Sequence, residues 1–291
     1  MVKIQTLQDA WDLYEMAILA SSKKRSQVTE TGRWNHYIFP ELGHKLIKNI
    51  TSFDYLMLRR KLEKQNLSPQ SVHHCLSLLR RVLLKSTEWG ICNDSIPSFK
   101  GIMPKFDNKR QRYLTKEELD NLLYTLKIID ETNNWHDITA FAVNTGLRRG
   151  EIFNLKSIDV NLTDKFASVV DTKSGKNRIV PLNDFAIDII SKKIIPKKTN
   201  RKLFENKSPK IFINAVKRSG LNNGITDLRQ KVVFHTLRHT FASWLVQDGI
   251  PIALVGQLLG HSNISMTMRY AHLAPSQAQH AVGLIADRLA A

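Results

Sequence analysis

The sequence has few cysteines, no long apolar run and no low-complexity block among its 291 residues. Its two cysteines, Cys75 and Cys92, are too far apart for a CxxC pair and too few for a zinc ribbon or a disulfide framework. No run of about 18 apolar residues predicts a membrane-spanning helix, and the N-terminal stretch carries acidic residues, unlike a signal peptide. These absences predict a folded cytoplasmic protein with reduced cysteines and no membrane partner.

Acidic residues are also scarce relative to basic ones. The chain has 43 Lys+Arg against 26 Asp+Glu, which gives a net charge of +17. A positive field of this size attracts polyanions, and nucleic acid is the commonest of them. Both the N-terminal and the C-terminal part of the chain are basic, so the charge does not belong to a detachable tail. Charge alone would also fit a basic but otherwise ordinary enzyme.

The N-terminal third of the chain predicts a domain built from helices alone. Apolar residues recur there at helical spacing, and Thr6 is the expected N-cap of the first helix. Further helices are expected in "VTETGRWNHYIFPELG", after Thr51, and from Ser68-Pro69 to about Trp89. We expect Pro40 and Gly43 to end the helix in "VTETGRWNHYIFPELG".

The last of these helices combines an apolar stripe with a cationic face. Its leucines and valine at helical spacing predict one buried side. The basic residues that project elsewhere, and that are candidates for DNA binding, are Arg80, Arg81 and Lys85. The alternative is an ordinary solvated surface, which a chain of near-zero net charge would favour.

A linker is expected to separate this helical domain from a second domain. Residues 97–112 contain two prolines, a glycine and several basic residues without a hydrophobic period. A basic linker can follow a phosphate backbone, which makes Arg110 and Arg112 further DNA-binding candidates. We expect the domains at 1–105 and 113–291, with the basic linker at 106–112.

The second domain is predicted to be mainly α with a small antiparallel β-sheet. Thr115 and Glu118 form a capping box that starts a helix, and a second helix ends at Gly146. Between residues 157 and 182 the hydrophobic period changes to about 2, and β-branched residues flank a turn at Ser174-Gly175. Helices continue from there towards the C-terminus. The fold class of the whole chain is therefore mainly α.

The sequence lacks the complete motifs of a nucleotide site or a zinc site. "TKSGKNR" lacks the GxxxxGK[ST] spacing of a phosphate-binding loop. His235 and His239 lie four residues apart, as in many zinc sites, with His261 as a conceivable third ligand. The HExxH pattern needs a glutamate beside the first histidine, however, and Thr236 occupies that position. We expect no metal and no cofactor.

Basic and hydrogen-bonding residues remain, each beside a structural signal that would present it. They are Arg148 in "NTGLRRGEI", Lys173 at the hairpin, Arg238 in "HTLRH" and His261 in "LLGHS". Converging on one point, they would bind a phosphodiester and compensate the charge of five-coordinate phosphorus. Tyr270 in "TMRYAH" is the candidate nucleophile, because surrounding cations favour the phenolate. A lone tyrosine would more simply be a core aromatic.

Five motifs in order carry a resemblance to a known family. "TGLRRGE", "TKSGKNRIVPL", "HTLRHTFASWL", "LLGHSNISMT" and "RYAH" resemble the catalytic domain of tyrosine recombinases, the phage integrase family. The resemblance is strong over about residues 113–275. It is weaker over 1–100, where "YIFPELGHKLIKNIT" and "LSPQSVHHCLSLLRRVL" are similar to the family's helical core-binding domain.

The resemblance implies a role for each residue of the candidate site. Arg148, Arg238 and His261 would hold the non-bridging oxygens of the scissile phosphate. Tyr270 would attack phosphorus to form a 3′-phosphotyrosyl link and free a 5′-hydroxyl, for which Lys173 would be the general acid.

The remaining residues of these motifs receive supporting roles. His235 would accept or relay the tyrosine proton, and Glu151 would brace the helix after the first arginine. Arg149 is expected to face DNA or solvent, and His239 is assigned to helix packing. We therefore expect His239→Gln to affect stability more than cleavage, and Arg238→Ala to abolish cleavage with the fold intact.

The implied function is site-specific DNA recombination. The resemblance implies a C-shaped clamp of core-binding and catalytic domains around double-stranded DNA that carries specific recombination sites. Four subunits would exchange strands through a Holliday junction to integrate or excise a phage or mobile element, with accessory DNA-bending proteins as further candidate partners. The C-terminal segment from residue 275 would dock on a neighbouring subunit or in cis. The alternatives are a type IB topoisomerase and a non-catalytic DNA-binding regulator.

Overall fold

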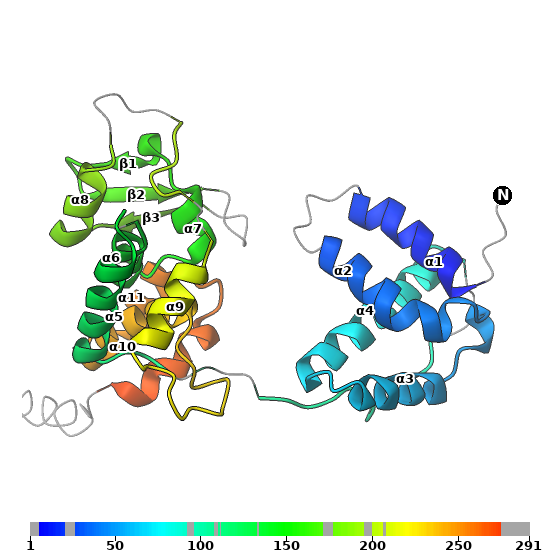
Figure 1. The fold of residues 1–291 in the computed structure, drawn as a ribbon. Coiled ribbons are helices and arrows are strands. Elements are labelled where there is room, and N and C mark those ends of the chain that lie inside the picture. The colour runs from blue at the N-terminus through cyan, green and yellow to red at the C-terminus, as the bar shows by residue number, and fades with distance from the viewer. Residues whose placement is uncertain are drawn as a thin grey trace, which may run out of the picture. The chain divides into compact units, whose positions relative to one another are not determined.

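The computed structural model describes residues 6–20, 27–91, 96–107, 110, 112–132, 134–170, 177–194, 200–205 and 208–274. The chain divides into two compact units, Met1–Asn108 and Lys109–Ala291 (Figure 1). In the described parts, no helix is both long and apolar enough to cross a membrane. Cys75 is buried, and burial raises the pKa of its thiol to about 11, whereas Cys92 lies outside the described residues.

The first unit is helical, as predicted. Its helical segments are α1 (Leu7–Tyr14), η1 (Glu15–Ala20), α2 (Gln27–Arg33), η2 (Trp34–Gly43), η3 (Ile47–Asn49), α3 (Ser52–Lys64) and α4 (Pro69–Glu88). Thr6 and Ser68 cap α1 and α4 with their side chains, and Thr51 forms a capping box with Asp54. The indole rings of Trp11 and Trp34 stack in the core with centroids 4.4 Å apart.

Two details of this unit differ from the prediction. Pro40 does not end its helix but lies inside η2, which has π-helical winding and runs on to Gly43. Proline has no N–H to donate to the α-helical hydrogen-bond pattern. The helix continues through Pro40 with the wider π-helical winding. Phe99 lies in the stretch 97–112, whose composition suggests a linker, but it is buried and stacks on Tyr55 with ring centroids 3.8 Å apart. The stretch around Phe99 therefore belongs to the core of the first unit.

The second unit is mainly helical and has a three-stranded antiparallel sheet in the order β1-β2-β3. Val180 of β3 pairs with Ala167 of β2, and both side chains are buried. The expected hairpin between these strands, including Lys173, falls at residues 171–176, outside the described residues. The strands are β1 (Val160–Asn161), β2 (Phe166–Val169) and β3 (Arg178–Pro181).

Helix α10 joins three other elements of the second unit. It packs against α6, α11 and η6 (Figure 1). Residues that approach one another on these elements thus come from distant parts of the sequence. The helical segments of this unit are α5 (Lys116–Ile129), α6 (Asn134–Thr145), α7 (Arg149–Asn154), η4 (Ser157–Asp159), α8 (Asp184–Ser191), α9 (Lys210–Arg218), α10 (Phe234–Gln247), α11 (Ile252–Leu259), η5 (Ile264–Met266) and η6 (Met268–Leu273).

Candidate active site

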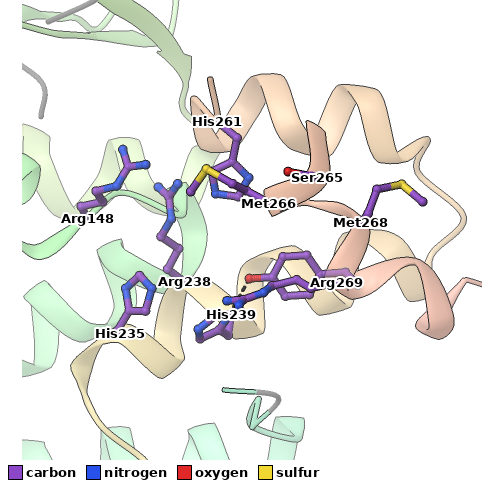
Figure 2. A pocket seen from close by; sticks show the side chains of 10 residues that line it. Arg148, His235, Arg238, His239, His261, Ser265, Met266, Met268 and Arg269 are labelled. Carbon is purple, nitrogen blue, oxygen red and sulfur yellow. Dashed lines mark hydrogen bonds between the residues drawn. The ribbon is translucent and has the colours of Figure 1, made fainter. Parts of the chain in front are cut away.

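A cavity of about 490 Å³ in the second unit gathers residues from α10, the α6–α7 connection and the segment after α11 (Figure 2). Its lining combines arginines and histidines with the side chain of a tyrosine. The lining residues are Arg148, His235, Arg238, His239, His261, Ser265, Met266, Met268, Arg269 and Tyr270.

Arg238 is a buried guanidinium on α10. Its Nη1 donates to the carbonyl of Gly146 at 2.7 Å and its Nη2 to the carbonyl of Leu259 at 2.6 Å. Both carbonyls lie at helix C-termini, those of α6 and α11, where they lack partners within the helix and the helix dipole is negative. Burial, assisted by the charge of Arg148, lowers the pKa of Arg238 to about 9, so the side chain stays charged at neutral pH.

Arg148 is held at the N-terminus of α7 by one carboxylate, that of Glu151. Its backbone N–H donates to Glu151 Oε2 at 2.8 Å and its Nη1 to Oε1 at 2.9 Å. Arg178 of β3 donates to the same two oxygens from Nη1 and Nη2, each at 2.9 Å. Burial would raise the pKa of Glu151, but the hydrogen bonds from Arg178 and Arg148 outweigh it and lower the pKa to about 2. A carboxylate that is charged at neutral pH therefore links the sheet to Arg148.

The turn into His261 depends on a glycine. Gly260 has a φ of +64°, a conformation that favours glycine. A Cβ at this position would lie only 2.6 Å from the side chain of Arg178. The turn thus brings His261 close to the residues that hold Arg148.

His235 and His261 are neutral at physiological pH. Burial, followed by the charges of Arg238 and Arg148, lowers the pKa of each imidazole to about 4. His261 Nδ1 lies 2.8 Å from the hydroxyl of Thr267, which orients the ring. Neutral imidazoles can donate to or accept from a phosphate without adding charge.

Tyr270 lies on η6 and lines the cavity. The side chain is buried, and its oxygen is 2.5 Å from His239 Nδ1. Burial raises the pKa of the phenol, although the charges of Arg269 and Arg238 oppose this shift. The ring also belongs to a small apolar cluster with Val246 and Leu259.

The structure brings five of the residues predicted from sequence into one cavity: Arg148, His235, Arg238, His261 and Tyr270. The sixth, Lys173, lies outside the described residues. Glu151 contacts Arg148, as expected from its position, and Arg149 is exposed with its guanidinium 5.3 Å from the ring centre of Phe153.

Sequence reasoning missed three residues of the site. His239 is buried, as its assignment to helix packing implied, but that assignment is incomplete because its ring contacts the Tyr270 hydroxyl. Arg178 reaches Glu151, and Arg269 lines the cavity beside the tyrosine. For Arg269, its place directly before the candidate nucleophile was the available signal.

Two of the three candidate DNA-binding residues of α4 form ion pairs with acidic side chains. Arg80 is exposed. Arg81 lies 3.3 Å from the carboxylate of Glu30, and Lys85 lies 2.7 Å from that of Glu88. Both pairs reduce the charge that the helix presents to a polyanion.

Arg110 and Arg112 are engaged with the second unit. Nη1 of Arg110 donates to the carbonyls of Leu228 and Lys231 at 2.8 and 3.2 Å. Arg112 forms a bidentate pair with Glu118, at 2.5 and 2.9 Å. In this arrangement both side chains fasten the start of the second unit instead of projecting freely as linker cations.

The cavity has the features of a phosphate site with a hydroxyl nucleophile. Two arginines supply fixed positive charge, and neutral histidines supply hydrogen bonds around the same space. Among the described residues, no three His, Cys, Asp or Glu side chains are grouped as metal ligands. Nucleophilic attack by Tyr270 on a phosphodiester held by the arginines is the chemistry that this geometry supports.

The chain is similar to known DNA-acting proteins. The Phage integrase family matches residues 112–277. The integrase of Salmonella phage P22 is 36% identical over 219 residues, which cover 69% of this chain and 53% of that integrase. The Tn1549 transposon integrase in complex with circular intermediate DNA has a similar fold, with 17% identity and a TM-score of 0.76 over 95% of this chain and 98% of its own.

Another similar structure is a lambda integrase dimer bound to a COC′ core site. It has 21% identity and a TM-score of 0.73, over 91% of this chain and 95% of its own. Lambda integrase is also seen as a tetramer bound to a Holliday junction. The chain spans between 53% and 63% of the length of the curated relatives that it matches.

Proposed function

Because the chain belongs to the phage integrase family, we propose that it is a site-specific recombinase that cuts and rejoins DNA through a 3′-phosphotyrosyl bond to Tyr270. The observation that carries the proposal is the shared cavity of the Tyr270 hydroxyl with Arg148, Arg238, His235 and His261. Its substrate is double-stranded DNA with specific recombination sites.

The groups that stabilise the charge on the scissile phosphate are already in position before DNA binds. Arg148 and Arg238 hold the non-bridging oxygens of the scissile phosphate, together with His261. Because each arginine is fixed by hydrogen bonds before DNA binds, little reorganisation is needed when charge builds up on phosphorus. Lys173 is the general acid for the leaving 5′-oxygen by the family pattern, and His235 belongs to the path of the tyrosine proton.

Strand exchange then needs neither ATP nor a metal. The energy of the broken phosphodiester is kept in the protein–DNA bond, so a 5′-hydroxyl from another strand can attack phosphorus and reverse the reaction. We propose four subunits on two sites that pass through a Holliday junction, in integration or excision of a phage or mobile element. The lambda integrase complexes, a dimer on a core site and a tetramer on a junction, support this assembly.

We propose that residues 1–105 are the core-binding domain and 113–291 the catalytic domain, joined by the linker at 106–112. The division of the chain at Asn108 and Lys109 supports these boundaries. The C-terminal segment from residue 275, expected to dock in cis or on a neighbouring subunit, lies outside the described residues.

A covalent-capture assay tests the proposal. The protein is incubated in EDTA with a pool of nicked duplexes of randomised sequence, and DNA that resists separation from denatured protein is collected. We expect an adduct with the wild-type protein and none with Tyr270→Phe, because only the phenol oxygen can form the link. An adduct that persists in Tyr270→Phe contradicts the mechanism, and loss of the adduct in EDTA points to a metal-dependent reaction.

The products on plasmids separate recombination from the alternative of a type IB topoisomerase. The duplex selected by capture is placed twice on a supercoiled plasmid. Recombination yields products joined between the two sites, whereas relaxation of supercoils without any joined products favours the topoisomerase. Binding without an adduct favours a non-catalytic regulator.

A further inference from the structure

His239 and Arg269 both contact the candidate nucleophile, and neither has a part in the proposed reaction so far. Nδ1 of His239 lies 2.5 Å from the oxygen of Tyr270, and the ring centroids are 5.8 Å apart. Among the described residues its other nitrogen, Nε2, is buried without a hydrogen-bond partner. Among the described residues, the hydrogen-bond partner of this imidazole is therefore the hydroxyl that would attack DNA.

His235 contacts the ring of His239. The two imidazole rings meet edge to face with centroids 4.7 Å apart, one helical turn apart on α10. Figure 2 shows His235 beside Arg238, with His239 farther along the same helix. Among the described residues, the phenol is therefore hydrogen-bonded to His239, and His239 meets His235 through a ring contact alone.

The charges around His239 determine which form of the ring meets the phenol. On its own helix it faces His235 and Arg238, from η6 it faces Arg269 and Tyr270, and from the start of the second unit the charge of Arg110 acts on it. Burial, followed by these charges, lowers the pKa of His239 to about 3, so the ring is neutral at physiological pH. A neutral ring has one donor and one acceptor nitrogen, so a phenol that donates to Nδ1 requires the proton on Nε2.

Resting on the proposed cleavage reaction, we propose that His239 orients the Tyr270 hydroxyl and accepts its proton through Nδ1 as the phenol oxygen attacks phosphorus. The oxygen–phosphorus bond forms while the bond to the 5′-oxygen breaks. The phenol proton moves to Nδ1, and the leaving 5′-oxygen takes a proton from the general acid, Lys173. The proton stays on His239 as the imidazolium, because Nε2 has no hydrogen-bond partner among the described residues to pass it on, and rejoining returns it from Nδ1 to the phenol oxygen.

Burial and the nearby positive charges both disfavour this transfer, and bound DNA offsets the second of these causes. Without DNA the arginines around the cavity disfavour a charged imidazole. A phosphodiester seated between Arg148 and Arg238 brings negative charge into the same space, which favours the imidazolium and raises the pKa of His239. The ring therefore becomes an effective proton acceptor when substrate is present, and Tyr270 stays protonated when it is absent.

Single-turnover cleavage with two variants of His239 tests the proposal. The probe is the duplex selected by capture, with sulfur replacing the bridging 5′-oxygen so that the leaving group needs no proton. His239→Asn places an amide oxygen near the former Nδ1, which keeps an acceptor for the hydroxyl but cannot take its proton. His239→Gln places its amide nearer the former Nε2. We expect both to lose about 10²- to 10⁴-fold in cleavage rate at neutral pH.

The pH profile separates proton acceptance from packing. In the wild-type protein we expect a rate nearly independent of pH around neutrality, because the acceptor is built in. In both variants the rate should become first order in hydroxide, because only solvent can then remove the phenol proton. A flat profile in His239→Asn overturns the proposal, as does hydroxide dependence that appears in His235→Gln but in neither His239 variant.

His136→Gln is the matched control, since His136 lies on α6 in the same unit and contacts Asp137, outside the cavity. It should leave both rate and profile unchanged. A measurement without DNA keeps the proposal distinct from the proposed function. In long-range ¹H–¹⁵N spectra of histidine-labelled protein, His239 should appear as the Nε2–H tautomer, with an Nδ1 shift that changes in Tyr270→Phe. An Nδ1–H tautomer overturns the proposal even if the adduct forms, whereas failure of every duplex to form an adduct refutes the cleavage reaction itself.

Discussion

The two sides of the cavity are held in place in different ways. On the side that would bind phosphate, Arg148 and Arg238 are fixed by charge-assisted hydrogen bonds to a carboxylate and to two helix-terminal carbonyls. On the side of the nucleophile, Tyr270 sits on the short η6 segment, in a small apolar cluster, with its hydroxyl on His239. The phosphate side is thus built into the core of the unit, whereas the tyrosine is attached at its edge.

Catalytic and structural roles therefore overlap on one side of the site and separate on the other. A buried arginine that satisfies backbone carbonyls cannot be removed without loss of stability. A tyrosine oxygen that makes a hydrogen bond in a small cluster can be removed at a lower cost. Changes that abolish the reaction equally should therefore differ in their effect on folding.

The largest effect is expected for Arg238→Ala. This change removes charge from the phosphate and leaves the carbonyls of Gly146 and Leu259 buried without donors, at about 1–3 kcal/mol each. Covalent adduct formation should be lost together with several kcal/mol of unfolding free energy, which urea titration measures. The expectation from sequence that the fold would stay intact is thus replaced by its opposite. Tyr270→Phe is the matched comparison, since it should lose the adduct but leaves one buried group without a partner, Nδ1 of His239, at about 1–3 kcal/mol of stability.

Equal stability of the two variants would show that Arg238 is not part of the structural core. The measurement should be made without DNA, because binding of DNA to the folded state alone would add stability that the variants do not share.

An intermediate effect is expected in acid, through Glu151. Its pKa is about 2 in the folded protein against 4.5 in the unfolded chain, so the charged carboxylate stabilises the fold above pH 4.5. This contribution, about 3 kcal/mol, should be lost as the pH falls from about 5 to 2. In Glu151→Gln the contribution is absent at every pH. The difference in unfolding free energy between wild type and variant should therefore be large at pH 7 and shrink in acid. A difference that stays constant would contradict a stabilising ion pair of Glu151 with Arg148 and Arg178.

The helices of the fold were predictable where their signals are local. The capping box of Thr115 and Glu118 and the Ser68 cap involve residues three apart, and both form as expected. Pro40 and Phe99 were misjudged because their outcomes depend on the surrounding core. Proline usually ends a helix, and a lone aromatic between prolines has no period that reveals burial.

The site divides in the same way. The spacing of His235 and Arg238 along one helix is enough by itself to indicate a shared face. The partners of Arg178 and His239 lie 27 and 31 residues away along the chain, so only the folded unit brings them together. Sequence also suggested that the arginines of the linker are free, whereas Arg112 pairs with Glu118.

The smallest effect, on DNA affinity, is expected for single arginines outside the cavity. Here an arginine that is exposed can be compared with one that forms an ion pair. Arg80 is exposed on α4, whereas Arg112 is held by Glu118. If Arg80 meets a DNA phosphate, Arg80→Ala should reduce the slope of log affinity against log salt by about 0.9 for a duplex of arbitrary sequence. Arg112→Ala should leave that slope unchanged and instead lower the unfolding free energy. Fluorescence anisotropy between about 50 and 200 mM salt measures the slopes. A smaller slope in Arg112→Ala with none in Arg80→Ala would place the DNA on the opposite set of arginines.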